Sequence, residues 1–499
     1  MTDRPESSIG SKLREAGRHS AIYGLGSVAQ SAVQFLLIPL LTGLFSKDDY
    51  GAYSIILMLS TVANAVFFLG MTSAMPRAYY DYDGDEDRRA VFTTAFMVLG
   101  MGAVLQMVVG FLCGPWISAL FLHTGRHAGV VGWAFLSGAI GFVNQYLFSY
   151  LRFARKSVVA VLFSVLALAG SIGLSVLLLK LAPGNLAAPF QATALTQALI
   201  AGLFFLRYGR QAFTLRLKRE TVAFLLRFGT GTVIASFAAM LLDWSDRILI
   251  ERYVSLADVG IYSAGYRLGS IVNVLMVVPF GQIWSPMMME YRTHSNIKEL
   301  FTRMLFYFLL FGTIVMVGTA LFLGDMLHWL IRSVPRSGQG MVMPIIILVM
   351  FGYLVNGTGN IVSAGLFYSR KVHVFIYVSY SVAVLKIATN LLVIPRFKTL
   401  GAAWTTAGAY LLLPILTYAS SKRFFAFPID WKRIGTLAMI ALPPVIFGAF
   451  FWYGFHLWIP VRVGIFLIVC MLVYKFCLNE EEKQYIIRMG RVLHLRRTV

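Results

Sequence analysis

Long apolar segments, separated by short polar connections, recur along almost the whole chain. Fourteen of them approach or exceed the roughly 20 residues that an α-helix needs to cross the hydrocarbon of a bilayer. The segments are 20–42, 50–73, 91–113, 128–150, 157–179, 188–206, 224–243, 258–281, 304–324, 342–366, 373–394, 401–420, 434–452 and 460–477. This pattern predicts an all-α, polytopic membrane protein with about 14 transmembrane helices.

Composition and charge support this interpretation and set the orientation. The chain is 58% hydrophobic and 13% charged, with a mean hydropathy of +0.74, which excludes a soluble globular protein. Loops expected on the side of the N-terminus contain 29 of the 43 Lys and Arg residues, and those on the opposite side contain 10. This bias predicts an N-in, C-in topology and accounts for the net charge of +21 without a nucleic-acid partner. Residues 1–19 then form a cytoplasmic tail, and 478–499 an amphipathic basic tail on the inner surface.

A short motif occurs twice and indicates an internal duplication. Ser46–Ser54 (SKDDYGAYS) and Ser255–Ser263 (SLADVGIYS) both fit S-x-x-D-x-G-x-Y-S, 209 residues apart. Each motif is expected to start a helix, with the serine as the N-cap and the aspartate three residues later completing a capping box.

The duplication predicts two six-helix lobes, an N-lobe at 20–206 and a C-lobe at 224–420, joined by a basic cytoplasmic linker at 207–223. Two extra helices follow at 434–477. Because each lobe has an even number of spans, both insert in the same orientation and form parallel repeats. Transporters built in this way usually hold their substrate near the midplane between the halves.

Charged residues lie close to the hydrocarbon around the second motif. Asp243 and the neighbouring pair Asp246-Arg247 end one span, and we expect that pair to be a helix-end pair near the outer surface. Arg267 lies in the next span. Gly265 and Gly269 share one helical face, suited to close packing, and Arg267 points almost opposite to it. Charged residues inside a membrane are costly and often functional, although an ion pair with Asp243 or Asp246 is the structural alternative for Arg267.

Several motifs, taken in order, resemble those of Wzx-type polysaccharide or O-antigen repeat-unit flippases of the multidrug/oligosaccharidyl-lipid/polysaccharide superfamily, which includes MATE transporters. The motifs are Tyr23-Gly24, Ile38-Pro39-Leu40, Tyr50-Gly51, Arg77-Ala78-Tyr79-Tyr80, Asp246-Arg247, 260–268, Asn390, Ile394-Pro395 and Leu400-Gly401-Ala402-Ala403. The resemblance implies translocation of an undecaprenyl-pyrophosphate-linked oligosaccharide across the bacterial inner membrane by alternating access, for exopolysaccharide, O-antigen or capsule synthesis. It also implies membrane lipids, a polysaccharide polymerase and export proteins as partners.

The resemblance suggests two groups of site residues. A cationic cavity for the pyrophosphate would use Arg267 and Lys386, with Arg77 and Arg152 at the cytoplasmic entrance, where ordinary positive-inside flanking residues are the alternative. The related lipid II flippases hold sodium at positions that match Asp243, Lys386, Asn390, Ala402 and Thr406. Since Lys386 stands where a neutral ligand is expected, its ammonium would replace the sodium and pair with Asp243. Coupling to a proton or to the membrane potential is then expected in preference to sodium.

Two other functions compete with this interpretation. A multidrug efflux transporter of the same superfamily would need acidic or aromatic groups for cationic drugs, which Arg267 and Lys386 disfavour. A polytopic polymerase or glycosyltransferase would need a substantial outer loop with catalytic residues, and the outer loops are short. We therefore expect a transporter and not an enzyme. The eight histidines and three cysteines show no metal-ligand spacing, so neither a metal nor another cofactor is expected.

Overall fold

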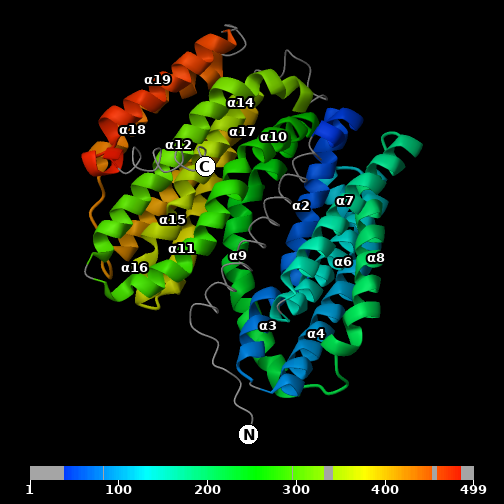
Figure 1. The fold of residues 1–499 in the computed structure, drawn as a ribbon. Helices are drawn as coiled ribbons and strands as arrows, with labels where there is room; N and C mark the ends of the chain where they lie inside the picture. The colour runs from blue at the N-terminus through cyan, green and yellow to red at the C-terminus, as the bar shows by residue number, and fades with distance from the viewer. Residues whose placement is uncertain are drawn as a thin grey trace, which may run out of the picture. The chain divides into compact units, whose positions relative to one another are not determined.

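The computed structural model describes residues 39–484, apart from Asp83, Arg155, Ser295, 331–340 and 452–457. The described residues are helical throughout, with short connections and no strands (Figure 1). They pack as two compact units. Unit one contains the residues up to Ser263 together with Asn390–Thr399, and unit two contains Ala264–Leu330, Val334–Thr389 and the residues from Leu400 onward. The N-lobe at 20–206 and the C-lobe at 224–420 expected from the duplication stay a prediction.

The prediction of a helical, polytopic membrane protein is confirmed. Among the described residues, twelve helical segments are long and apolar enough to cross a membrane. The expected span at 20–42 lies mostly outside the described residues. The spans expected at 373–394 and 401–420 are joined in one 50-residue helix, α17 (Val372–Ser421), whose regular geometry is interrupted at Lys398 (φ 52°, ψ −138°). The total of fourteen and the N-in, C-in topology stay predictions.

Unit one is a bundle that begins with the first motif. Its helices are α2 (Lys47–Phe67), α3 (Met71–Tyr80), α4 (Asp85–Leu112), α5 (Gly114–Leu122), α6 (Ala128–Phe153), α7 (Ser157–Leu181), α8 (Ala188–Ala212), α9 (Arg219–Tyr253) and the first part of α10 (Leu256–Gly269). Helices α6, α7 and α8 lie side by side (Figure 1). An apolar core of large side chains, including Phe92, Tyr146 and Phe204, fills the space between α3, α4, α6 and α8.

Two glycines allow α9 to pack closely against the junction of α2 and α3. Leu69 and Gly70 both have positive φ (45° and 62°), which turns the chain between the two helices. A Cβ added at Gly229 would lie 1.9 Å from the Leu69 carbonyl oxygen, and one at Gly70 would lie 2.6 Å from the Gly229 carbonyl oxygen. Any side chain at Gly229 would therefore force these backbones apart.

Unit two is built on the second part of α10 and the helices that follow. These are α11 (Val278–Glu290), α12 (Ile297–Leu330), α14 (Val342–Gly357), α15 (Gly359–Val362), α16 (Ala364–Tyr368), most of α17, α18 (Trp431–Ile446) and α19 (Ile459–Cys477). A π-helical turn at Asn273–Val277 connects α10 to α11. The extra helices α18 and α19 pack against α12 (Figure 1).

Polar contacts secure this extra pair. Arg462 of α19 is buried and forms an ion pair with Asp325 of α12. After α19, Glu482 forms an ion pair with Arg433 of α18 and accepts a hydrogen bond from the Tyr307 hydroxyl at 2.6 Å. Burial would raise the pKa of Glu482, but these hydrogen bonds and one from the Asn479 backbone outweigh it and hold that pKa below its ordinary value. The start of the tail expected at 478–499 is thus attached to unit two, while residues 485–499 lie outside the described part.

The linker before α9 is attached to the start of α4. Lys218 and Arg216 form ion pairs with Asp87 (2.9 Å) and Glu86 (3.1 Å). The hydrogen bond to Asp87 raises the pKa of the Lys218 ammonium. The basic residues of this predicted linker therefore bind the acidic first turn of α4.

Candidate functional site

Asp246 is a fully buried carboxylate that lies about two turns before the end of α9. Its side chain is 0% exposed. Oδ2 accepts a hydrogen bond from the Tyr262 hydroxyl of α10 at 2.7 Å, and Oδ1 accepts one from Nδ2 of Asn390 of α17 at 2.6 Å. A buried carboxylate needs such donors, because its charge loses the solvation of water. Asp246 thus joins three helical segments of unit one through charge-assisted hydrogen bonds.

The prediction that Asp246 and Arg247 form a helix-end pair is wrong, while their position near the outer surface stays a prediction. Helix α9 continues to Tyr253, so neither residue ends it. Successive residues on a helix point about 100° apart, which turns the two side chains in different directions. Asp246 faces the interior, whereas Arg247 donates to the Asp243 carbonyl oxygen at 3.0 Å and to the Ser263 hydroxyl at 3.1 Å.

Asp246, which was not among the predicted site residues, is thus an acid that contacts Asn390. Asp243 is half-buried one turn earlier on α9. Sequence reasoning also missed Tyr262, because it lies in the duplicated motif, for which only a helix-capping role is predicted. The spacing does indicate Asp246 as a second candidate. Asp243 and Asp246 are three residues apart and share a helical face, so either could match the acidic position of the related flippases.

The predicted packing face of α10 is confirmed. A Cβ at Gly265 would lie 3.0 Å from the Ile345 side chain, and one at Gly269 would lie 2.7 Å from the Ile346 carbonyl oxygen, both in α14 of unit two. Arg267 is half-buried. Next to it, the buried Tyr266 hydroxyl lies 3.0 Å from that of Tyr353 and 3.2 Å from that of Tyr410.

The other predicted site residues of α17 are buried. Lys386 is 2% exposed, and Asn390, one turn later, is 0% exposed. Thr406, beyond the interruption at Lys398, is also fully buried. An almost completely buried ammonium is uncommon in any protein and needs compensating partners. The predicted pairing of Lys386 with Asp243 stays a prediction, as does the role of Thr406.

The two predicted entrance arginines are exposed. Arg77 of α3 lies over the ring of Phe228, with 5.6 Å between its guanidinium carbon and the ring centroid. Arg152, near the end of α6, donates to the Ser149 hydroxyl at 3.5 Å. Within the described part of the chain, no three His, Cys, Asp or Glu side chains are grouped so that they could hold a metal ion.

Comparison with known proteins identifies relatives in sequence and in fold. The family model described as "Polysaccharide biosynthesis protein" matches residues 16–292. "Succinoglycan biosynthesis transport protein ExoT" of Rhizobium meliloti (strain 1021) is 24% identical over 263 residues, which are 51% of this chain and 49% of ExoT. The chain thus matches about half of the length of this curated relative.

Solved structures extend the likeness to nearly the whole chain. Lipid II flippase MurJ in an inward closed conformation has a TM-score of 0.72 at 16% identity, covering 90% of this chain and 99% of MurJ. The Vibrio cholerae MATE transporter VcmN has a TM-score of 0.57 at 14% identity, with coverages of 83% and 98%. The MATE multidrug transporter DinF-BH gives 0.56 at 17% identity, with coverages of 85% and 98%. At these identities the likeness establishes a shared fold.

Proposed function

Because the polysaccharide biosynthesis family model matches more than half of the chain, the protein belongs to that family, and we propose that it is a flippase for lipid-linked oligosaccharides. It would move an undecaprenyl-pyrophosphate-linked repeat unit across the bacterial inner membrane by alternating access, for exopolysaccharide, O-antigen or capsule synthesis. The family match is the observation that carries this proposal. The twelve apolar helices among the described residues and the MurJ-like fold support it. The relatives are transporters and flippases, and this chain is a transporter and not an enzyme.

The buried cations indicate the charge of the substrate. A pyrophosphate carries about two negative charges at neutral pH. The half-buried Arg267 provides a planar guanidinium that suits phosphate oxygens, and the buried Lys386 provides a compact ammonium. We assign both to pyrophosphate binding, with the exposed Arg77 and Arg152 as weaker contributors at the cytoplasmic entrance. An inside-negative membrane potential would favour outward movement of the head group by about 2.3 kcal/mol per charge per 100 mV.

We add Asp246 to the predicted ion-coupling group, beside Asp243. The contact of Asp246 with Asn390 supports this addition, because Asn390 is a predicted member of the group and donates a hydrogen bond to Asp246. Replacing Asp246 by Asn should alter the dependence of flipping on the proton gradient. Sodium-stimulated flipping that disappears in Asp243→Asn would contradict the predicted role of Lys386.

A multidrug exporter is the second candidate, because MATE transporters share the fold. The two functions predict opposite charge preferences. A flippase for pyrophosphate-linked sugars requires cations in its substrate path, whereas an exporter of cationic drugs would be impaired by Arg267 and Lys386.

The deciding experiment uses purified protein in liposomes with a fluorescent prenyl-pyrophosphate-linked oligosaccharide and, separately, a cationic dye. We expect wild type to flip the glycolipid and not to transport the dye. Arg267→Ala and Lys386→Ala should slow flipping by more than about tenfold, since a charge-assisted hydrogen bond contributes about 1.5–3 kcal/mol.

Arg267→Lys and Arg423→Ala serve as controls. Arg267→Lys keeps the positive charge but loses the planar guanidinium, which can donate two parallel hydrogen bonds, and should retain partial activity. Arg423 is an exposed cation just after α17, and its removal should have little effect. Equal flipping by wild type, Arg267→Ala and Lys386→Ala would exclude the assigned cation role, and transport of the dye alone would identify an exporter.

A further inference from the structure

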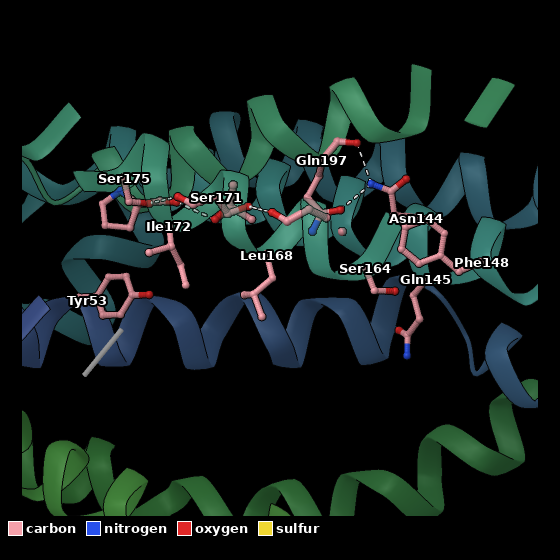
Figure 2. Close-up of a pocket in the computed structure, with 14 residues that line it drawn as sticks. Tyr53, Asn144, Gln145, Phe148, Ser164, Leu168, Ser171, Ile172, Ser175 and Gln197 are labelled. Atoms are coloured by element: carbon pink, nitrogen blue, oxygen red, sulfur yellow. Dashed lines mark hydrogen bonds between the residues drawn. The ribbon is translucent and has the colours of Figure 1, made fainter. Parts of the chain in front are cut away.

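Unit one contains a polar cavity that none of the predicted site residues lines. It lies among α2, α6, α7 and α8 and has a volume of about 350 Å³ (Figure 2). This volume is at the lower end of the range of about 300–1,000 Å³ for small-molecule sites. Eight of its fourteen lining residues are polar and uncharged, and none of the fourteen is charged. The lining therefore suits a neutral, polar ligand and offers no cation to a phosphate.

One face of α7 supplies the wall of this cavity. Ser164, Ser171 and Ser175 are seven and four residues apart and lie on the same side of the helix (Figure 2). The opposite side is apolar and exposed, with Leu162 at 52% and Leu166 at 48%. Such a side can face lipid, so the serines face the interior of the bundle. Small polar residues often serve only for close helix packing, but close packing would leave no cavity beside them.

The three serine hydroxyls present hydrogen-bond acceptors to the cavity. Each donates its proton to the carbonyl oxygen four residues earlier, at 2.8 Å for Ser164, 2.7 Å for Ser171 and 2.6 Å for Ser175. A hydroxyl has one donor and two acceptor lone pairs, so its acceptor capacity remains available. A matching ligand must contribute donors, as the hydroxyl groups of a sugar do.

A buried amide next to these serines has an unused acceptor. Asn144 is 1% exposed, and its Nδ2 donates both to the carbonyl oxygen of Gln197 at 2.7 Å and to its Oε1 at 2.6 Å (Figure 2). Its Oδ1 accepts no hydrogen bond from the described residues. Unpaired buried acceptors are rare, because they have lost hydration without compensation. The hydrogen bonds to Gln197 thus fix the Asn144 amide in the wall of the cavity.

An aromatic side chain completes the lining from α2. Tyr53 faces the serine wall of α7 across the cavity (Figure 2). Its ring packs against Phe190, with 5.0 Å between the ring centroids, which limits its movement. A fixed ring beside several polar groups is typical of sites that orient a small ligand with both apolar and polar faces. A pyranose has both kinds of face.

From this lining we propose that the cavity is a subsite for an uncharged sugar. The inference rests on the proposed flippase function and adds a neutral sugar to the substrate class, held by α6, α7 and α8 of unit one. The sugar hydroxyls donate to Ser171 and Ser175, which are one helical turn apart, and Tyr53 bounds the sugar ring. The pyrophosphate binds elsewhere, because no cation lines this cavity.

The test measures equilibrium binding to the full chain in lipid nanodiscs by fluorescence anisotropy. Three fluorescent prenyl pyrophosphates are compared: one carries a neutral oligosaccharide, one an acidic oligosaccharide of equal length, and one no sugar. Wild type should bind the neutral glycolipid most tightly. Ser171→Leu, which fills the cavity, should weaken binding of that probe by more than about tenfold, to the value of the sugar-free lipid. Ser171→Ala removes one neutral hydrogen bond and should weaken it by about 2- to 10-fold.

Ala169→Leu is the matched control, because it adds the same side chain on the exposed side of α7. It should leave all three affinities unchanged. The inference is overturned if Ser171→Leu keeps the preference for the neutral sugar, if it weakens all three probes equally, or if wild type does not distinguish the probes. The flipping assay on wild type separates this result from the proposed function. Sugar-selective binding without flipping would refute the flippase and retain the subsite.

Discussion

The two copies of the duplicated motif, Ser46–Ser54 and Ser255–Ser263, form the same local structure and differ in what their tyrosines bind. Both serines cap their helices. The Ser46 hydroxyl accepts from the Asp49 amide at 3.1 Å, and the Ser255 hydroxyl accepts from the Asp258 amide at 3.0 Å. The predicted capping role of both motifs is thereby confirmed. Shared sequence here encodes two equivalent helix starts.

The two copies also pack against each other through equivalent atoms of unit one. A Cβ at Gly51 would lie 2.0 Å from the Leu256 carbonyl oxygen, and a Cβ at Gly260 would lie 2.3 Å from the Lys47 carbonyl oxygen. At the offset of 209 residues, Gly51 corresponds to Gly260 and Lys47 to Leu256. The contact is therefore reciprocal, as expected for two duplicated segments related by an approximate twofold axis.

The difference begins two residues after the glycines. Tyr53 packs its ring on Phe190 and lines the polar cavity, whereas the equivalent Tyr262 donates its hydroxyl to the buried Asp246. Further along, the buried Met58 corresponds to Arg267. The two copies thus share a symmetric frame, and Arg267 after the second copy has no charged counterpart after the first.

The largest effect is expected from breaking the contact that the copies share. Gly51→Ala and Gly260→Ala each place a methyl group against a backbone oxygen of the opposite helix. Neither helix can relieve this overlap by a side-chain rotation, so each substitution should destabilise the protein by about 3 kcal/mol, at the upper end of the range for overpacking. An SDS titration in mixed micelles would measure the loss.

Gly202→Ala is the control, because a Cβ at Gly202 of α8 meets no atom within 4 Å. It should be neutral or stabilising by up to about 1 kcal/mol, as alanine favours the helix. A stability unchanged by Gly51→Ala but lowered by Gly260→Ala would show that the reciprocal contact does not hold.

The second largest effect is a difference in stability between variants of the two equivalent tyrosines, Tyr262 and Tyr53. Tyr262→Phe removes a hydrogen bond to a buried carboxylate, which should cost about 1.5–3 kcal/mol. Tyr53→Phe keeps the ring contact with Phe190, so a smaller loss of about 0.5–1.5 kcal/mol is expected. The same SDS titration compares the two variants. Equal losses would indicate that Asp246 gains no special stabilisation from Tyr262.

Much of the fold could be predicted from sequence, because apolar length and local capping depend on neighbouring residues. The spans, the caps of Ser46 and Ser255, and the packing face of Gly265 and Gly269 are examples. The contact between Gly51 and Gly260 could not be predicted, since a repeat does not reveal that its copies meet. Asp246 was misplaced because a charge near the end of an apolar run looks exposed, and only the neighbouring helices show that it is buried. The proposed sugar site at the serines of α7 could not be predicted from the sequence, because helix packing and ligand binding both use small polar residues.

The smallest effect concerns the caps and tests whether the shared frame behaves as one structure. Ser46→Ala and Ser255→Ala should each cost about 1 kcal/mol, since each leaves an amide at a helix start without its acceptor. Ser46→Thr and Ser255→Thr retain a capping hydroxyl and should cost less.

The two helix starts touch through Lys47 and Gly260, so removing one cap should also destabilise the other helix start. The double variant should therefore depart from the sum of the single losses by about 0.5 kcal/mol or more. If the losses in the free energy of unfolding are strictly additive in the SDS titration, the two helix starts unfold independently. The symmetric frame would then be a geometric similarity without energetic coupling.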